Sequence, residues 1–159
     1  MRNYIALAAC AVSLVLVNVS IAGKERLLRD GRIVYLELAP VDPRSLMQGD
    51  YMALRFKLAN DALPAAKGAA AFDGHIVATV DQRGVAGYRR LHDGKPVASN
   101  ELLLRYRVRY NDLRFATNAF FFEEGTGARY EQARYGEFRV APDGELLLTG
   151  LRSRDLRKL

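Results

Sequence analysis

The sequence of 159 residues contains no tryptophan, one cysteine, two histidines and five prolines. The single cysteine excludes an internal disulfide framework and any zinc or iron–sulfur site that needs several thiolates. The histidines, His75 and His92, stand far apart in the sequence and beside no nucleophile motif. The chain also lacks a phosphate-binding loop, a dinucleotide fingerprint and a calcium loop. We therefore expect no cofactor, no bound metal and no catalytic histidine.

What the chain does contain is a globular mixture of residues. Half of the residues are hydrophobic and 26% are charged, which excludes an intrinsically disordered chain. The length allows one domain, with or without an anchor, and hardly two. The net charge is +6, and setting aside Arg2 leaves +5 for residues 24–159. This excess is too small to predict a nucleic-acid partner.

One hydrophobic run stands out, at the N-terminus. No charged side chain occurs from Asn3 to Gly23. About 20 helical residues span about 30 Å, the thickness of the hydrocarbon core of a bilayer. The run predicts a transmembrane helix, and the helical pattern continues until Asp30-Gly31. We assign residues 1–23 to an N-terminal membrane anchor and residues 24–159 to a single antiparallel β-rich domain.

Three interpretations of the run remain open. A retained signal-anchor is favoured, because the basic residues over 24–29 continue the helix and can lie at the membrane surface. A cleaved signal peptide is the second interpretation, since Ser20 and Ala22 are small residues ahead of Gly23. A lipoprotein signal ending at Cys10 is the third, and the short stretch before this cysteine argues against it.

The charges around the run do not fix the orientation of the anchor. Basic residues are more numerous after the run than before it, which by the positive-inside rule favours a cytoplasmic domain. Long domains translocate largely regardless of charge, however, and a short start before an apolar run is typical of exported proteins. We expect a single-pass protein of the inner (cytoplasmic) membrane whose C-terminal domain is periplasmic.

The chain after the anchor predicts antiparallel strands. Residues 101–110 alternate, with a dry face of Leu102, Leu104, Tyr106, Val108 and Tyr110. Residues 50–58 alternate in the same way, so that Met52, Leu54, Phe56 and Leu58 share one face. Shorter strands are expected at residues 33–39, 75–81, 85–91, 138–141 and 145–149, the last two forming a hairpin.

Turns and one helix complete the predicted fold. Asp-Gly pairs at residues 30–31, 73–74, 93–94 and 143–144 predict tight turns with a positive φ. A short helix is expected over residues 127–135, with Thr126 as its N-cap. Residues 60–71, which include Pro64 and Gly68, form the loosest stretch. The fold class is mainly β: a transmembrane helix, then a small antiparallel β-barrel or sandwich with one short helix.

Two groups of charged residues invite a functional interpretation. Arg105, Arg107 and Arg109 share the wet face of one predicted strand, which we interpret as a solvated face paired with nearby acids. The neighbouring carboxylates Glu123 and Glu124 point to opposite sides of a strand, so that they alone cannot form a glycosidic acid–base pair. We expect them to lead into the short helix or to pair with the arginines at positions 129 and 134.

Two blocks of sequence resemble one family. Residues 38–56, LAPVDPRSLMQGDYMALRF, resemble the pattern Gly-Asp-Tyr-X-X-Leu-X-Tyr with Gly49, Asp50, Tyr51, Leu54 and, in the last place, Phe56 instead of tyrosine. Residues 120–140, FFFEEGTGARYEQARYGEFRV, and the apolar N-terminus are also similar to this bacterial, membrane-anchored GDYXXLXY family. The resemblance covers nearly the whole chain. It implies a membrane anchor and association with multi-pass membrane proteins, and it supplies no catalytic residues.

The first block is interpreted as scaffolding. Pro43 and Gly49 suit a turn, in which Asp50 accepts hydrogen bonds from backbone N–H groups. Leu54 and Phe56 then point into the core.

The second block supplies the candidate interaction surface. In a strand, three consecutive phenylalanines cannot share one side, so either Phe121 emerges opposite Phe120 and Phe122 or the reverse holds. The favoured alternative is that the helix over residues 127–135 folds back on the exposed side and makes all three core residues. The candidate interaction residues are Phe121, Glu123, Glu124, Tyr130 and Arg134. The favoured function is a non-enzymatic interaction module on a membrane partner. The alternative is an envelope hydrolase or small-ligand-binding domain, which would need Asp50, Tyr51, Glu123, Glu124 and Arg134 around one pocket.

Overall fold

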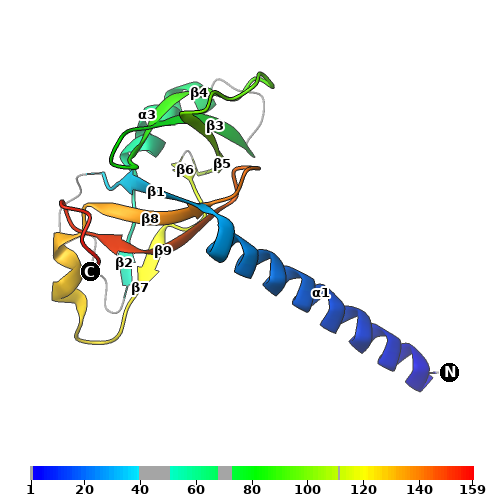
Figure 1. The fold of residues 1–159 in the computed structure, drawn as a ribbon. Coiled ribbons are helices and arrows are strands. Elements are labelled where there is room, and N and C mark those ends of the chain that lie inside the picture. Colours follow the sequence, from blue (N-terminus) through cyan, green and yellow to red (C-terminus); the bar gives the residue numbers. More distant parts are fainter. Residues whose placement is uncertain (1, 40–50, 68–72, 111) are drawn as a thin grey trace.

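A computed structural model describes residues 2–39, 51–67, 73–110 and 112–159 (Figure 1). Within the first helix, side chains are described at Tyr4, at Leu7 and from Ala9 onwards. A long helix, α1 (Arg2–Asp30), projects from a domain of short strands, which also contains the helix α3 (Lys57–Lys67).

The described large apolar side chains of α1 are exposed from Tyr4 to Ile21. No helix in the described part of the chain is long and apolar enough to cross a membrane. The C-terminal part of α1 contacts the domain: Leu27 is buried, and Lys24 forms an ion pair with Glu145. The helix ends at Asp30 as predicted, where the N–H of Gly31 donates to the carbonyl oxygen of Leu27 at 3.0 Å.

The named strands form three antiparallel sheets. One has the order β1–β8–β9, from β1 (Arg32–Glu37), β8 (Tyr135–Val140) and β9 (Leu146–Arg152). Another has the order β4–β3–β5–β6, from β3 (Asp73–Val80), β4 (Ala86–Leu91), β5 (Glu101–Arg109) and β6 (Asp112–Arg114). The third is a ribbon of β2 (Tyr51–Ala53) and β7 (Ala119–Phe121). The prediction of a mainly β fold with antiparallel pairing is confirmed.

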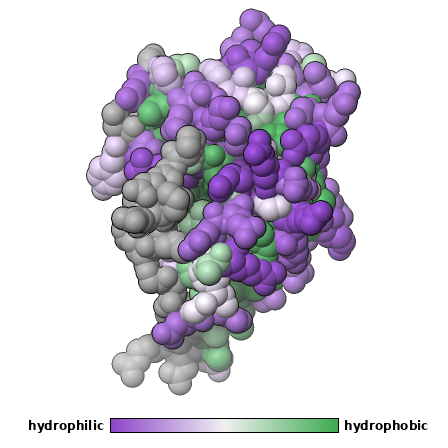
Figure 2. Space-filling view, turned by 90° about the vertical axis from the view of Figure 1, so that its left-hand side faces the viewer, coloured by the Kyte–Doolittle hydropathy of each residue, from purple (hydrophilic) through white to green (hydrophobic). Residues whose placement is uncertain are grey.

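The sheets share one hydrophobic core. Its largest fully buried side chains come from β1, β3, β5, β8 and β9: Val34, Leu36, Ile76, Leu104, Phe138 and Leu151. Backbone hydrogen bonds join the sheets, for example from the N–H of Arg105 to the oxygen of Gly144 at 2.8 Å. The face opposite α1 is mostly hydrophilic where its residues are described (Figure 2).

The strongest strand prediction is right except at its end. On β5, Leu102, Leu104, Tyr106 and Val108 are buried as the alternation predicts, and burial raises the pKa of the Tyr106 hydroxyl. Tyr110 was expected on the same dry face, but 96% of it is exposed. Its φ of 51° lies in the left-handed region, so the strand has ended at Arg109 and the chain has turned.

The expected strand over residues 50–58 is largely replaced by other structure. β2 covers only Tyr51–Ala53, and α3 begins at Lys57. The predicted inward face is nevertheless right, because Met52, Leu54, Phe56 and Leu58 are all buried.

Residues 60–71 were expected to be the loosest stretch, and little helix was expected beyond the anchor. Both expectations are wrong over Lys57–Lys67, which form helix α3. Its buried residues, Leu58, Ala59, Ala62 and Ala66, recur at helical spacing and face β1, β4 and β6. Pro64 lies inside the helix, where a proline removes one backbone hydrogen bond. The close packing that the small alanines allow offsets this loss.

The Asp-Gly pairs divide into two groups. Gly94 and Gly144 have φ values of +84° and +86°, which confirms the predicted turns. Gly31 and Gly74 have no positive φ, and the turn prediction is wrong there. Gly74 lies inside β3, where an added Cβ would stand 3.0 Å from the hydroxyl of Tyr106. Its role is close approach to a neighbouring strand.

Candidate functional site

The two sequence blocks meet in the β2–β7 ribbon. Tyr51 pairs with Phe121, and Met52 pairs with Phe120, although the two strands are far apart in the sequence. Beyond the ribbon, Phe56 packs edge-on against Phe138, with ring centroids 5.4 Å apart. Leu54 and Phe56 are therefore core residues, as expected. Pro43, Gly49 and Asp50 lie outside the described residues, and their proposed turn stays a prediction.

The three phenylalanines separate onto two faces of the ribbon. Phe121 is 75% exposed, whereas Phe120 and Phe122 pack against the core. The ring of Phe121 lies 5.8 Å from that of Tyr51 across the strand pair. Of the arrangements left open by the sequence, the one in which Phe121 emerges is therefore the one observed.

A short 3-10 helix, η1 (Gly127–Gln132), covers the inner face of the ribbon. Its Tyr130 stacks on Phe122 and packs edge-on against Phe120, with centroid distances of 5.3 and 5.1 Å. The alternative in which a helix covers all three phenylalanines is wrong, because η1 lies on one side only. Tyr130 itself, one of the candidate interaction residues, is half-buried and engaged within its own chain.

The acidic pair lies on an exposed turn beside Phe121. The carbonyl oxygen of Glu123 accepts bonds from the N–H and the hydroxyl of Thr126, at 3.1 and 2.7 Å, and Gly125 has a φ of +79°. The glutamates therefore lead into η1, which is the first of the two alternatives expected from the sequence. Thr126 does not cap η1 with its side chain, which corrects the N-cap prediction, because its hydroxyl bonds backwards to Glu123.

The predicted pairing of the glutamates with arginines does not occur among the described residues. Arg134 instead donates to the carbonyl oxygens of Ala133 and Glu131, at 2.7 and 3.3 Å, where η1 ends. Its guanidinium therefore satisfies helix-end carbonyls, whereas Glu123 and Glu124 face solvent.

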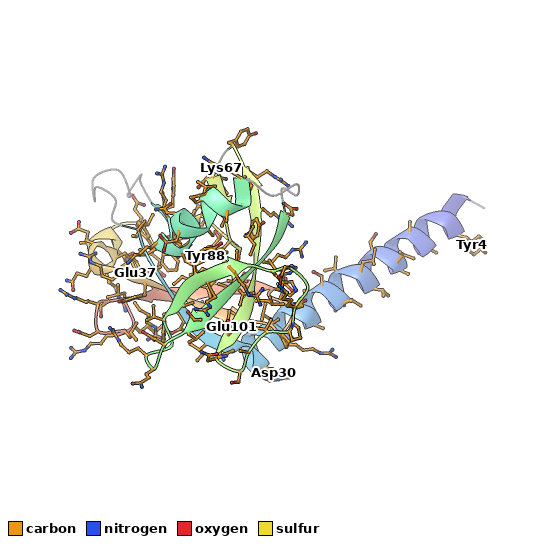
Figure 3. All side chains as sticks on the ribbon, turned by 90° about the horizontal axis from the view of Figure 1, so that it is seen from above. Tyr4, Asp30, Glu37, Lys67, Tyr88 and Glu101 are labelled. Atoms are coloured by element: carbon orange, nitrogen blue, oxygen red, sulfur yellow. The ribbon has the colours of Figure 1, made fainter. Side chains whose placement is uncertain are left out.

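Glu123, Glu124 and Arg134 line none of four cavities formed by described residues, and Arg55 of the first block lines only the smallest of the four. The largest of these, about 430 Å³, includes Glu37 and Tyr88 (Figure 3) and also Asp81. Glu37 lies 3.4 Å from the ammonium group of Lys57, and Asp81 accepts two backbone N–H groups of its own turn at 2.8 Å. These carboxylates are engaged in holding the fold. Sequence reasoning missed the cavity, whose residues come from distant segments.

His75 of β3 and His92, which directly follows β4, come together although they stand far apart in the sequence. Their ring centroids are 6.5 Å apart, and the N–H of His92 donates to the carbonyl oxygen of His75 at 2.9 Å. In the described part of the chain no group of three or more His, Cys, Asp or Glu side chains could hold a metal ion.

The arginine face of β5 is partly neutralised, as predicted. Asp73 of β3 lies 3.5 Å from Arg109 and 4.0 Å from Arg107. Arg105 has no ion pair with any described residue.

The chain is similar to one protein family over most of its length. A family model described as "GDYXXLXY protein" matches residues 13–151, which is most of the chain. Comparisons with curated proteins and with solved structures gave no match. The family match spans the ribbon, η1 and the core strands described above. The chain therefore belongs to the GDYXXLXY family.

Proposed function

We propose that this protein is a membrane-anchored, non-enzymatic interaction domain. In this proposal α1 holds the chain in the inner membrane, and the outer face of the β2–β7 ribbon docks on a multi-pass membrane protein. The observation that carries the proposal is Phe121, a large apolar side chain left exposed on a ribbon that the two family blocks build together.

The anchor is supported by the surface of α1. Its large apolar side chains, among them Val15 and Leu16, are exposed on all sides of the helix. An apolar segment exposed on all sides suits a lipid environment, and among the described residues of α1 the contacts with the domain come from Lys24 and Leu27, near its C-terminal end. Retention rather than cleavage at Gly23 is supported by the continuity of α1 through that residue to Asp30.

The docking face is supported by its composition. Phe121 beside Tyr51 provides an aromatic centre, and Glu123 and Glu124 provide an acidic rim. Interfaces commonly place aromatic anchors at the centre and polar groups at the rim. The complementary partner surface would combine an apolar pocket with Lys or Arg side chains.

The hydrolase or small-ligand alternative has less support. It needs the acids and arginines of the two blocks around one cavity. Glu123 and Glu124 stand on an exposed turn with their side chains in solvent, and Arg134 is bound to backbone carbonyls at the end of η1, so these side chains do not converge on a cavity.

The substitution Phe121→Ser tests the docking face. Because Phe121 is mostly exposed, we expect the melting temperature of the full chain to change little and the co-purification of its membrane partner to be lost. Tyr110→Ser is the matched control, since Tyr110 is an exposed aromatic residue away from the ribbon. A large fall in melting temperature for Phe121→Ser, or equal partner recovery from both variants, would reject the docking face.

We further propose that the domain is periplasmic. Alkaline phosphatase, which requires an oxidising compartment, should be active when fused after Leu159, and a reporter that works only in the cytoplasm should be inactive there. The reverse pattern would place the domain in the cytoplasm while leaving the anchor itself in place.

A further inference from the structure

A basic cleft lies where α1 meets the domain. It has a volume of about 260 Å³ and lies beside the β8–β9 hairpin, next to which α1 leaves the domain (Figure 1). Four cationic side chains line it, one from α1, two from β5 and one from β6: Lys24, Arg105, Arg107 and Arg114. One carboxylate, Glu145, also lines it. The cleft therefore has an excess of positive charge.

The cations of the cleft are incompletely neutralised. Glu145 pairs with Lys24, and Asp112 lies 3.2 Å from Arg114. Arg107 is 4.0 Å from Asp73, beyond hydrogen-bonding distance. Arg105 has no partner side chain among the described residues. The guanidinium groups of Arg105 and Arg107 thus keep donors for an anion, and such planar donors match phosphate oxygens well.

Part of the wall of the cleft is apolar. Phe115 and Leu146 are buried core residues that reach the cleft, and Leu147 lies beside them. A ligand that fits would carry an anionic group next to an apolar portion.

The position of the cleft along α1 indicates which class of anion would reach it. Lys24 is the first charged residue after the uncharged segment that ends at Gly23. If α1 is inserted as proposed above, Lys24 and the cleft stand at the level of the lipid headgroups. At that level the abundant anion attached to an apolar body is the phosphodiester of an anionic phospholipid.

We propose that the cleft between α1, β5 and β6 binds the headgroup of an anionic phospholipid, with Arg105 and Arg107 donating to its phosphodiester. The proposal rests on the membrane anchorage proposed above. Such a contact would fix the tilt of the domain on the membrane and so the direction in which the ribbon faces its partner.

Lipid binding to the full chain, purified in a neutral detergent, tests the proposal. Native mass spectrometry would count bound phosphatidylglycerol, phosphatidylcholine and inorganic phosphate. We expect phosphatidylglycerol to be retained and the other two to be lost. The double variant Arg105→Gln/Arg107→Gln should bind phosphatidylglycerol about tenfold or more weakly. Arg55→Gln/Arg129→Gln, which removes the same charge from exposed positions outside the cleft, should bind like the unaltered chain.

Each other outcome overturns the inference. Equal retention of phosphatidylcholine would show that the cleft does not distinguish an anionic headgroup from a zwitterionic one. Equal retention of inorganic phosphate would indicate a site for a free anion. An equal loss in both double variants would mean attraction by net charge alone. Flotation of the unaltered chain with liposomes distinguishes this inference from the proposed anchor. If the chain floats but shows no lipid selectivity, only the cleft proposal is rejected. If the chain does not float, the proposed anchor is rejected.

Discussion

The double substitution Val15→Asp/Leu16→Asp should release the full chain from membranes. Both side chains are exposed on α1, in the middle of the uncharged segment. Each aspartate near the centre of a membrane helix costs about 2.5–3.5 kcal/mol of insertion free energy, so the pair costs about 5–7 kcal/mol. In alkaline extraction and flotation, the unaltered chain should stay with the membrane and the double variant should leave it.

The control for this experiment is Leu28→Asp. Leu28 is an exposed residue of the same helix, but it lies beyond Lys24 and outside the uncharged segment. We expect this variant to stay membrane-bound. If the double variant resists extraction as firmly as Leu28→Asp, then α1 is not the anchor and the domain is held by some other contact.

The substitution Phe138→Ala should cost about 3–5 kcal/mol of unfolding free energy, because it leaves a cavity in the core. Phe138 is fully buried at the centre of the β1–β8–β9 sheet, and its ring packs edge-on against Phe56. The packing is tight, since a Cβ added at Gly136 would lie 3.0 Å from both rings. Urea unfolding of the full chain in mild detergent, followed by circular dichroism, measures the loss.

The matched control is Phe121→Ala, which removes an exposed ring of the same kind. It should change the unfolding free energy by no more than about 0.5 kcal/mol. Similar losses for both variants would contradict the separation of the phenylalanines into core and surface.

Strands could be predicted where the sequence pattern that specifies them lies among neighbouring residues. β5 shows period-two alternation over its whole length, and the turn at Gly144 sets the β8–β9 hairpin from neighbouring residues. α3 was missed because alanines and Pro64 are loop signals when taken singly. What stabilises this helix is its packing on β1, β4 and β6, which no local pattern contains.

The same limit applies to the candidate site: features set by neighbouring residues could be predicted, and contacts between distant segments could not. The alternation of a strand is enough to place Phe121 opposite its neighbours. It is not enough to show that Tyr130 covers one side only, or that β2 and β7 are partners, because these contacts join distant segments. The same holds for the basic cleft, where Lys24 and Glu145 meet from nearly opposite ends of the chain.

The central claim is that the exposed ribbon face contacts a membrane protein, and photo-crosslinking in native membranes tests it most directly. A photoreactive phenylalanine analogue would replace Phe121 in one strain and Tyr110 in another, both positions being exposed aromatic residues. We predict one discrete adduct with an integral membrane protein at Phe121 and none at Tyr110. Absence of an adduct at Phe121, or the same adducts at both positions, would contradict the claim.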